Sequence, residues 1–295
     1  MRLNDFGRNI RVRDQRRSGG GLGGGLGGGG KLGCGAVVVA IIGAVVFGID
    51  PSTTLATFDQ VQGGMNSQSA PTGQDGGQTL EQSCTVNAYS LESCAALSSL
   101  DDTWQPLFMA ANLPFRRPVL NFYDGTGGSG CGTAQAAMGP FYCPADEGIY
   151  IDTSFYDDLQ GRFGAGGDFA RAYVMAHEYG HHVQKLTGIA DQVRSAQSQD
   201  RSSANQLQVR MELQADCYAG VWAARNRDRI EPGDLDEGMR AAAAIGDDTL
   251  MRNAGQRMAP ESFTHGTSAQ RTQWLQRGLT TGDEDQCDTF ADLRR

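Results

Sequence analysis

The 295-residue sequence is poor in histidine, in positive charge and in closely spaced cysteines. It contains four histidines and no C-x-x-C pair, which argues against a zinc finger or a dithiol redox centre. The formal net charge is -9, and residues 32–295 alone carry 18 basic against 32 acidic residues. A nucleic-acid-binding protein needs a basic surface, so we expect no nucleic-acid partner.

Arginine and glycine are instead concentrated at the start of the chain. Residues 1–31 carry seven basic residues and a Gly/Leu low-complexity run, a composition that buries too little apolar surface to order itself. Residues 32–49 are 18 uncharged residues in a row. As a helix they would span about 27 Å, close to the ~30 Å of a membrane's hydrocarbon core. Residues 50–80 are rich in Gln, Gly, Ser and Thr, as flexible linkers are.

These segments predict a basic Gly-rich cytoplasmic tail (1–31), one transmembrane helix (32–49), a linker (50–80) and a folded domain (81–295). Basic flanks stay in the cytoplasm, so the N-terminus would lie inside and the domain outside. A cleaved signal peptide would need a small-x-small site, and the apolar run ends in Phe47-Gly48-Ile49-Asp50-Pro51 instead. Small residues at every fourth position of the run would permit a homo-oligomer, although such residues are common in membrane spans.

The cysteines agree with an extracytoplasmic domain. Six of the seven lie beyond the apolar run, and an even number there indicates disulfides. Six cysteines permit many pairings, so the connectivity is a hypothesis. Proximity in sequence favours two pairs and leaves the third: Cys84 with Cys94, Cys131 with Cys143, and Cys217 with Cys287.

Two of the four histidines form H-E-x-x-H, a signature of zinc metalloproteases. The motif runs from His177 to His181, within a stretch whose apolar residues recur with helical spacing. Positions i and i+4 share one helix face, so His177 and His181 can ligate one metal ion. Glu178 is rotated by about 100° from His177. Its carboxylate can therefore flank the metal and act as a general base.

A catalytic zinc ion needs a third protein ligand and one open position. The extended motif H-E-x-x-H-x-x-G-x-x-H is excluded, because Gln184 and Thr187 occupy its last two defining positions. Residues 206–224 form a predicted helix on which Glu212 and Asp216 share a face. Glu212 could ligate the metal while Asp216 accepts a hydrogen bond from a ligand histidine. The alternative for Glu212 is an exposed helical carboxylate, but its apolar surroundings favour burial with a partner.

The pattern H-E-Y-G-H-H-V-Q followed by E-L-Q-A-D-C-Y-A-G resembles bacterial predicted neutral zinc metallopeptidases of the YpfJ-like family, which are similar to the gluzincins. The resemblance extends over nearly the whole chain, including the basic N-terminus and the apolar run. It implies a bacterial inner-membrane protein with Zn²⁺ as its cofactor. Residue by residue, it implies His177, His181 and Glu212 as ligands, Glu178 as catalytic base and Asp216 as an acid behind the ligands.

A further histidine, His265, lies in the run T-H-G-T-S-A-Q-R, which is similar to the T-H-P-x-x-x-x-R element of membrane-linked gluzincins, with Gly266 in place of Pro. We hypothesise that His265 donates a hydrogen bond to the developing oxyanion and that Arg271 helps to orient this region. His265 could instead cap or pack at the start of a helix over 268–279. As a fourth ligand it would make the zinc structural.

Three segments predict strands on the substrate side. Residues 118–124 and 148–153 alternate apolar and polar residues, and 141–142 could pair with the latter. An exposed edge strand beside the zinc helix could hold an extended peptide. The predicted fold is α+β: a small, mostly antiparallel sheet packed on a zinc-binding active-site helix, a mostly helical C-terminal half, and one transmembrane helix before them.

The sequence thus predicts a membrane-anchored zinc metalloendopeptidase that hydrolyses peptide bonds of extracytoplasmic protein or peptide substrates, with zinc-activated water and Glu178 as base. The alternative is a zinc-stabilised, membrane-anchored scaffold or interaction module without proteolytic activity. Glu178 favours the enzyme, because a purely structural zinc site has no need of that carboxylate.

Overall fold

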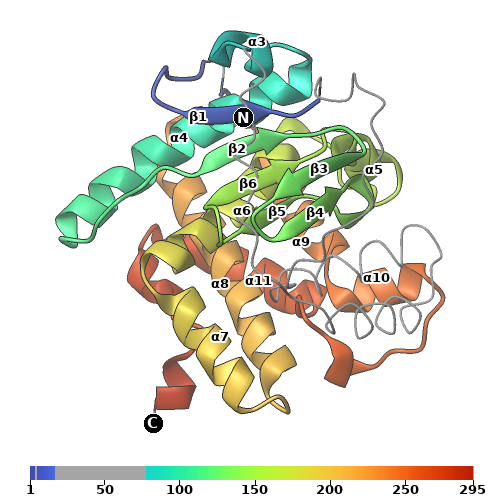
Figure 1. The fold of residues 1–295 in the computed structure, drawn as a ribbon. Coiled ribbons are helices and arrows are strands. Elements are labelled where there is room, and N and C mark those ends of the chain that lie inside the picture. The colour runs from blue at the N-terminus through green and yellow to red at the C-terminus, as the bar shows by residue number, and fades with distance from the viewer. Residues whose placement is uncertain (4, 17–77, 295) are drawn as a thin grey trace, which may run out of the picture.

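The computed structural model of the chain describes residues 1–3, 5–16 and 78–294, which form two small sheets among many helices (Figure 1). Its strands are β1 (Arg11–Asp14), β2 (Val119–Phe122), β3 (Thr126–Ser129), β4 (Gly132–Gln135), β5 (Phe141–Cys143) and β6 (Gly148–Ile151). Its α-helices are α3 (Leu80–Cys84), α4 (Ala88–Ala110), α5 (Phe155–Gly161), α6 (Asp168–Leu186), α7 (Ile189–Gln199), α8 (Ala204–Arg225), α9 (Asp234–Ala244), α10 (Asp247–Asn253) and α11 (Ser268–Thr281).

The larger sheet has the strand order β1-β2-β6-β5 and is mixed. β1 and β6 both run parallel to β2, and β5 pairs antiparallel with β6, as predicted for this hairpin. β3 and β4 form a separate antiparallel pair. The prediction of a mostly antiparallel main sheet is therefore wrong. An alternating pattern fixes which face of a strand is buried, whereas strand direction depends on the connections, and the long path from β2 to β6 returns the chain in the same direction.

The described start of the chain belongs to the same folded unit as the rest. β1 pairs with β2 from Arg11 opposite Val119 to Asp14 opposite Phe122. Met1 and Ile10 lie in the main hydrophobic core. The expectation of a segment without structure does not hold here, because β2 and the core supply the apolar partners that the short segment lacks by itself.

The predicted membrane anchor needs correction. Among the described residues, no helix has the length and apolar character needed to cross a membrane. The predicted span, residues 32–49, lies outside the described residues. Because β1 and β2 share one sheet, the chain before this span and the domain after it cannot lie on opposite sides of a membrane. This contradicts the predicted single-pass inner-membrane location, with a cytoplasmic N-terminus and an extracytoplasmic domain.

The three disulfides pair as the sequence predicts. Cys84–Cys94 joins α3 to α4, and Cys131–Cys143 joins the turn between β3 and β4 to β5. Cys217–Cys287 closes the longest loop, with a sequence separation of 70, and fixes the chain after α11 to α8. A crosslink over a longer loop removes more conformational entropy from the unfolded chain. By this measure the Cys217–Cys287 disulfide, which lies beside the predicted acids of α8, stabilises the folded state more than the other two.

A close approach of two helices positions the predicted site. A Cβ atom on Gly180 of α6 would lie only 2.9 Å from the Cα atom and 3.0 Å from the carbonyl oxygen of Ala215 in α8. Glycine therefore lets the two backbones pack more closely than any other residue would. This contact explains the glycine inside an otherwise good helix, where it costs about 1 kcal/mol relative to alanine.

Gly180→Ala is expected to lower the free energy of unfolding by about 1–3 kcal/mol, because the added methyl group overpacks a backbone contact. It should also weaken metal binding by pushing α8 away from α6. Urea unfolding and chelator competition measure the two effects. Gly161→Ala is the matched control, since a Cβ atom on this last residue of α5 meets nothing within 4 Å. Wild-type behaviour of Gly180→Ala would contradict the close approach.

Candidate metal centre

α6 and α8 bring the three predicted ligands together. The Nε2 atoms of His177 and His181 lie 3.1 Å and 3.6 Å from the same carboxylate oxygen, Oε2, of Glu212. The two imidazole rings are almost perpendicular, with centroids 4.9 Å apart. His177 and Glu212 are buried and His181 is half-buried. Two imidazoles from successive turns of α6 and a carboxylate of α8 thus point toward one another.

The arrangement fits a tetrahedral zinc ion. Bonds of about 2.0–2.1 Å to nitrogen and oxygen would place neighbouring donor atoms about 3.3 Å apart. The observed separations of 3.1 Å and 3.6 Å bracket this value. Two imidazoles and one carboxylate are also the donor set of catalytic zinc sites that keep a fourth position open. All three ligands line a cleft of about 140 Å³, which gives that position access to a substrate.

Asp216 lies behind the ligands in a fully buried network. Its Oδ1 atom accepts hydrogen bonds from His177 Nδ1 at 2.8 Å and from the Tyr173 hydroxyl at 2.5 Å. Arg271 adds two contacts, from Nε to Oδ2 at 2.8 Å and from Nη2 to Oδ1 at 2.9 Å. Burial by itself raises the pKa of Asp216, but Arg271 and His177 outweigh this effect and lower it. Asp216 therefore stays ionised and holds His177 with Nε2 directed at the metal position.

His181 is oriented in a comparable way. Its Nδ1 atom lies 2.9 Å from the side-chain oxygen of Gln184, which is itself buried. The Gln184 amide donates to the carbonyl oxygen of Met211 in α8 at 2.7 Å. This glutamine therefore links the second ligand to the helix that supplies the third. In the sequence it only served to exclude the extended motif, although its place three residues after His181 was an available clue.

Glu178 is buried beside the ligands and lines the same cleft. It is not part of the ligand group, which contains His177, His181 and Glu212. Burial raises the pKa of the Glu178 carboxyl above its ordinary value. A raised pKa is what a carboxylate needs in order to accept and return a proton near neutral pH.

His265 lines the cleft from another direction and is held by Asp247. Its Nδ1 atom lies 3.0 Å from Asp247 Oδ1, while Oδ2 accepts the backbone N–H groups of His265 at 2.7 Å and of its two neighbours. The Nε2 atom is buried, has no hydrogen-bond partner among the described residues and belongs to a lining residue. Gly266 has φ +84°, a conformation closed to proline, which explains why the T-H-P element is altered here.

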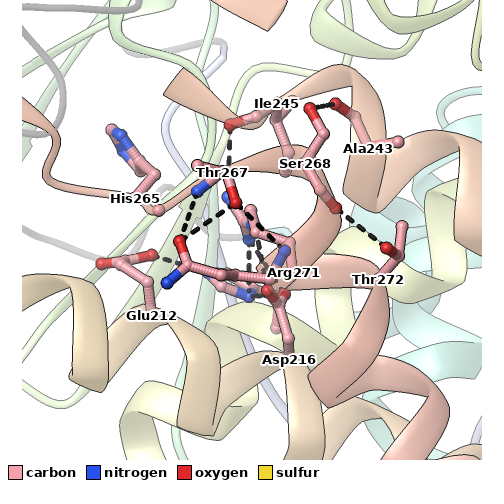
Figure 2. A network of polar contacts seen from close by, with 12 residues as sticks. Glu212, Asp216, Ala243, Ile245, His265, Thr267, Ser268, Arg271 and Thr272 are labelled. Carbon is pink, nitrogen blue, oxygen red and sulfur yellow. Dashed lines mark hydrogen bonds and ion pairs between the residues drawn. The ribbon is translucent and has the colours of Figure 1, made fainter. Parts of the chain in front are cut away.

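Arg271 and Asp247 have contacts that the sequence did not predict. Arg271 was predicted to orient the region of His265, whereas it contacts Asp216 and Tyr173, and His265 points away from it (Figure 2). Thr267 accepts the hydrogen bond that caps α11, so His265 does not have that role. Asp247 and Tyr173 were missed as site residues. Tyr173 lies four residues before His177 on the same helix face, but nothing in the sequence relates Asp247 to His265.

Two histidines of α6 and a glutamate of α8 thus converge in an arrangement that fits a zinc ion. Residues 1–290 match the model of a family described as "putative neutral zinc metallopeptidase". The chain belongs to this family, as the resemblance predicted, and its cofactor is Zn²⁺.

Two relatives illustrate the extent of the similarity. The chain is 51% identical over 197 residues to the "uncharacterized protein YpfJ" of Escherichia coli K12, covering 66% of this chain and 69% of the relative. It is 39% identical over 266 residues to the "uncharacterized protein Rv2575" of Mycobacterium tuberculosis H37Rv, covering 84% of this chain and 85% of the relative. No solved structure matches the chain significantly.

Asp216→Asn is expected to weaken zinc binding by about 10–100-fold, because the ring of His177 loses its charged acceptor. Tyr173→Phe should have a smaller effect, since Asp216 keeps its contacts with Arg271. Competition with a chelator of known affinity measures both variants. Arg225→Ala, on the surface at the far end of α8, is the control. Unchanged zinc affinity of Asp216→Asn would refute the orienting role.

Proposed function

We propose that the protein is a zinc-dependent endopeptidase that hydrolyses peptide bonds of protein or peptide substrates. One observation carries the proposal: a buried carboxylate, Glu178, lines the same cleft as a ligand set that leaves one position open. A structural zinc site is closed by four protein ligands and has no use for an acid that lines an open cleft beside it. An accessible position next to a proton acceptor is instead the requirement for hydrolysis.

When bound, zinc supplies a Lewis acid that polarises the scissile carbonyl and favours deprotonation of water. Glu178 accepts the proton of the attacking water and later donates it to the nitrogen of the leaving amine. Both transfers suit a carboxyl group whose pKa is raised by burial. Asp216 and Gln184 keep the two imidazole ligands in place throughout.

His265 would stabilise the negative charge that develops on the carbonyl oxygen. Its Nε2 atom is the buried polar atom of the cleft without a hydrogen-bond partner among the described residues. The contact of 3.0 Å between Nδ1 and Asp247 Oδ1 fixes the orientation of the ring. The arrangement resembles other acid–histidine pairs in which the acid holds the ring in place.

β5 would hold the substrate backbone. It is paired with β6 on one side only within the described residues, and Phe141 and Tyr142 line the cleft. A hydrogen bond of 3.0 Å joins the Tyr142 hydroxyl to His182 Nδ1, and His182 Nε2 lies 2.6 Å from the Arg116 carbonyl oxygen. This buried histidine fixes β5 to α6. An extended peptide added to the free edge would therefore pass the metal centre at a fixed distance.

Glu178→Gln is expected to keep its zinc and to lose peptide hydrolysis by about 10²–10⁴-fold, because the amide cannot accept the proton of water. Zinc content by metal analysis and hydrolysis of casein or a peptide mixture measure the two properties. Glu261→Gln, an exposed glutamate outside the cleft, is the control. Full activity of Glu178→Gln would show that the base is assigned wrongly. A zinc-loaded wild type that cleaves no peptide would favour the scaffold alternative.

Asp247→Asn and His265→Gln are both expected to lower kcat, by about 10²-fold, while KM and zinc content stay near those of the wild type. The reason is that His265 acts on charge present only in the transition state. Steady-state kinetics with one peptide separate kcat from KM. Asp228→Asn, an exposed acid away from the cleft, serves as the control. A change confined to KM would place His265 in substrate binding instead.

A further inference from the structure

The cleft extends beyond the reacting groups to a wall formed by α7. This helix follows α6 after Gly188, which turns the chain with φ +80°. Its residues at positions i, i+3, i+4 and i+7 share one helix face and line the cleft: Ala190, Val193, Arg194 and Gln197. Met211 of α8 and Pro144, just after β5, line the cleft as well. Of the elements that build this part of the cleft, only α8 also supplies a residue to the metal centre.

Two of the four lining residues of α7, Ala190 and Val193, are apolar, and the other two are Arg194 and Gln197. Val193 and Met211 belong to a small hydrophobic cluster separate from the main core. Such a surface accepts an apolar side chain of a substrate. The cationic side chain in this wall, Arg194, is a different kind of group and needs its own explanation.

Arg194 has no ionic or hydrogen-bonding partner among the described residues. The other arginine of the cleft, Arg271, is buried and paired with Asp216 through two nitrogen atoms. The acid of α7, Asp191, is paired with Lys185 at 3.0 Å. Arg194 is exposed, so its guanidinium keeps its hydrogen-bonding capacity for an incoming group. A planar fork of donors is best matched by a carboxylate.

The net negative charge of the protein makes Arg194 a selective binding position for an anionic group of the substrate. The net charge of -9 disfavours the approach of an anionic substrate group to the protein as a whole. A cation in the cleft that has no partner among the described residues attracts such a group locally. Repulsion elsewhere and attraction at one point together favour one placement of the substrate along the cleft.

We propose that Arg194 is a specificity-determining residue that binds a carboxylate of the substrate. The preferred substrate carries an apolar residue for the lining of α7 and, close to it in sequence, a carboxylate for Arg194. The carboxylate is either the side chain of Asp or Glu or the C-terminus of a peptide. This inference rests on the proposed function, since it concerns the substrate of the same cleft.

Binding to the zinc-loaded Glu178→Gln variant tests the inference without requiring turnover. Three fluorescent peptides share one apolar core: one has an internal Asp and an amidated C-terminus, one has a free C-terminus and no acid, and one has neither. We expect at least one of the first two to bind about tenfold more tightly than the third, as a charge-assisted pair would provide. The stronger of the two identifies the source of the carboxylate.

Second substitutions in the same variant assign the preference to Arg194. Arg194→Ala should abolish it, and Arg194→Glu should favour a peptide with Lys in place of Asp. Arg201→Ala is the matched control, because Arg201 is an exposed arginine in the turn after α7 that does not line the cleft. The preference should also decrease as salt is added.

Equal affinity for the three peptides, absence of binding for all of them, or a preference that survives Arg194→Ala overturns the inference. Hydrolysis by the wild type is measured in parallel with the same peptides. If the wild type cleaves them without distinction, the proposed function stands and the role of Arg194 fails. If the wild type cleaves none while the variant shows the Arg194-dependent preference, the carboxylate site stands and the peptidase fails.

Discussion

The packing of α6 against α8 at Gly180 is the constraint on which the site depends. The two histidines both come from α6 and determine only on which face of that helix a metal ion can bind. The third ligand comes from α8, which follows α7 in the chain. The absence of a side chain at Gly180 sets the distance between the two backbones. Without that distance, Glu212 would lose both imidazoles and keep only the hydrogen bond from Gln208 of its own helix, which is unfavourable for a buried carboxylate.

A second close crossing completes the arrangement. A Cβ atom on Gly278 of α11 would lie 2.0 Å from the carbonyl oxygen of Cys217, and one on Gly220 of α8 2.3 Å from that of Leu275. α11 can therefore lie directly on α8 and deliver Arg271 to Asp216 in the interior. Glu212 thus faces the two histidines of α6, and Asp216 is paired with Arg271 of α11. The same crossing places the loop before α11, with His265, at the cleft.

The sequence could predict what depends on local spacing. The common face of His177 and His181, the place of Glu212 on an apolar helix, and the hairpin of β5 and β6 follow from periodicities of a single element or two neighbouring ones. The pairing of His265 with Asp247 depends on how α10 and the loop before α11 pack together. No helical or strand periodicity in the sequence predicts this packing. Strand β1 is likewise defined only by its pairing with β2.

The cleft combines two parts that the fold stabilises separately. At one end Tyr173 packs in the main core, Arg271 is paired with Asp216, and His265 is held by Asp247. At the other end α7 is held by the small cluster of Val193, Leu207 and Met211. A change at Val193 in that cluster alters the lining of the cleft without touching the Gly180 contact between α6 and α8. The residues proposed for catalysis and those proposed for substrate recognition by α7 are thus supported by different hydrophobic clusters of one domain.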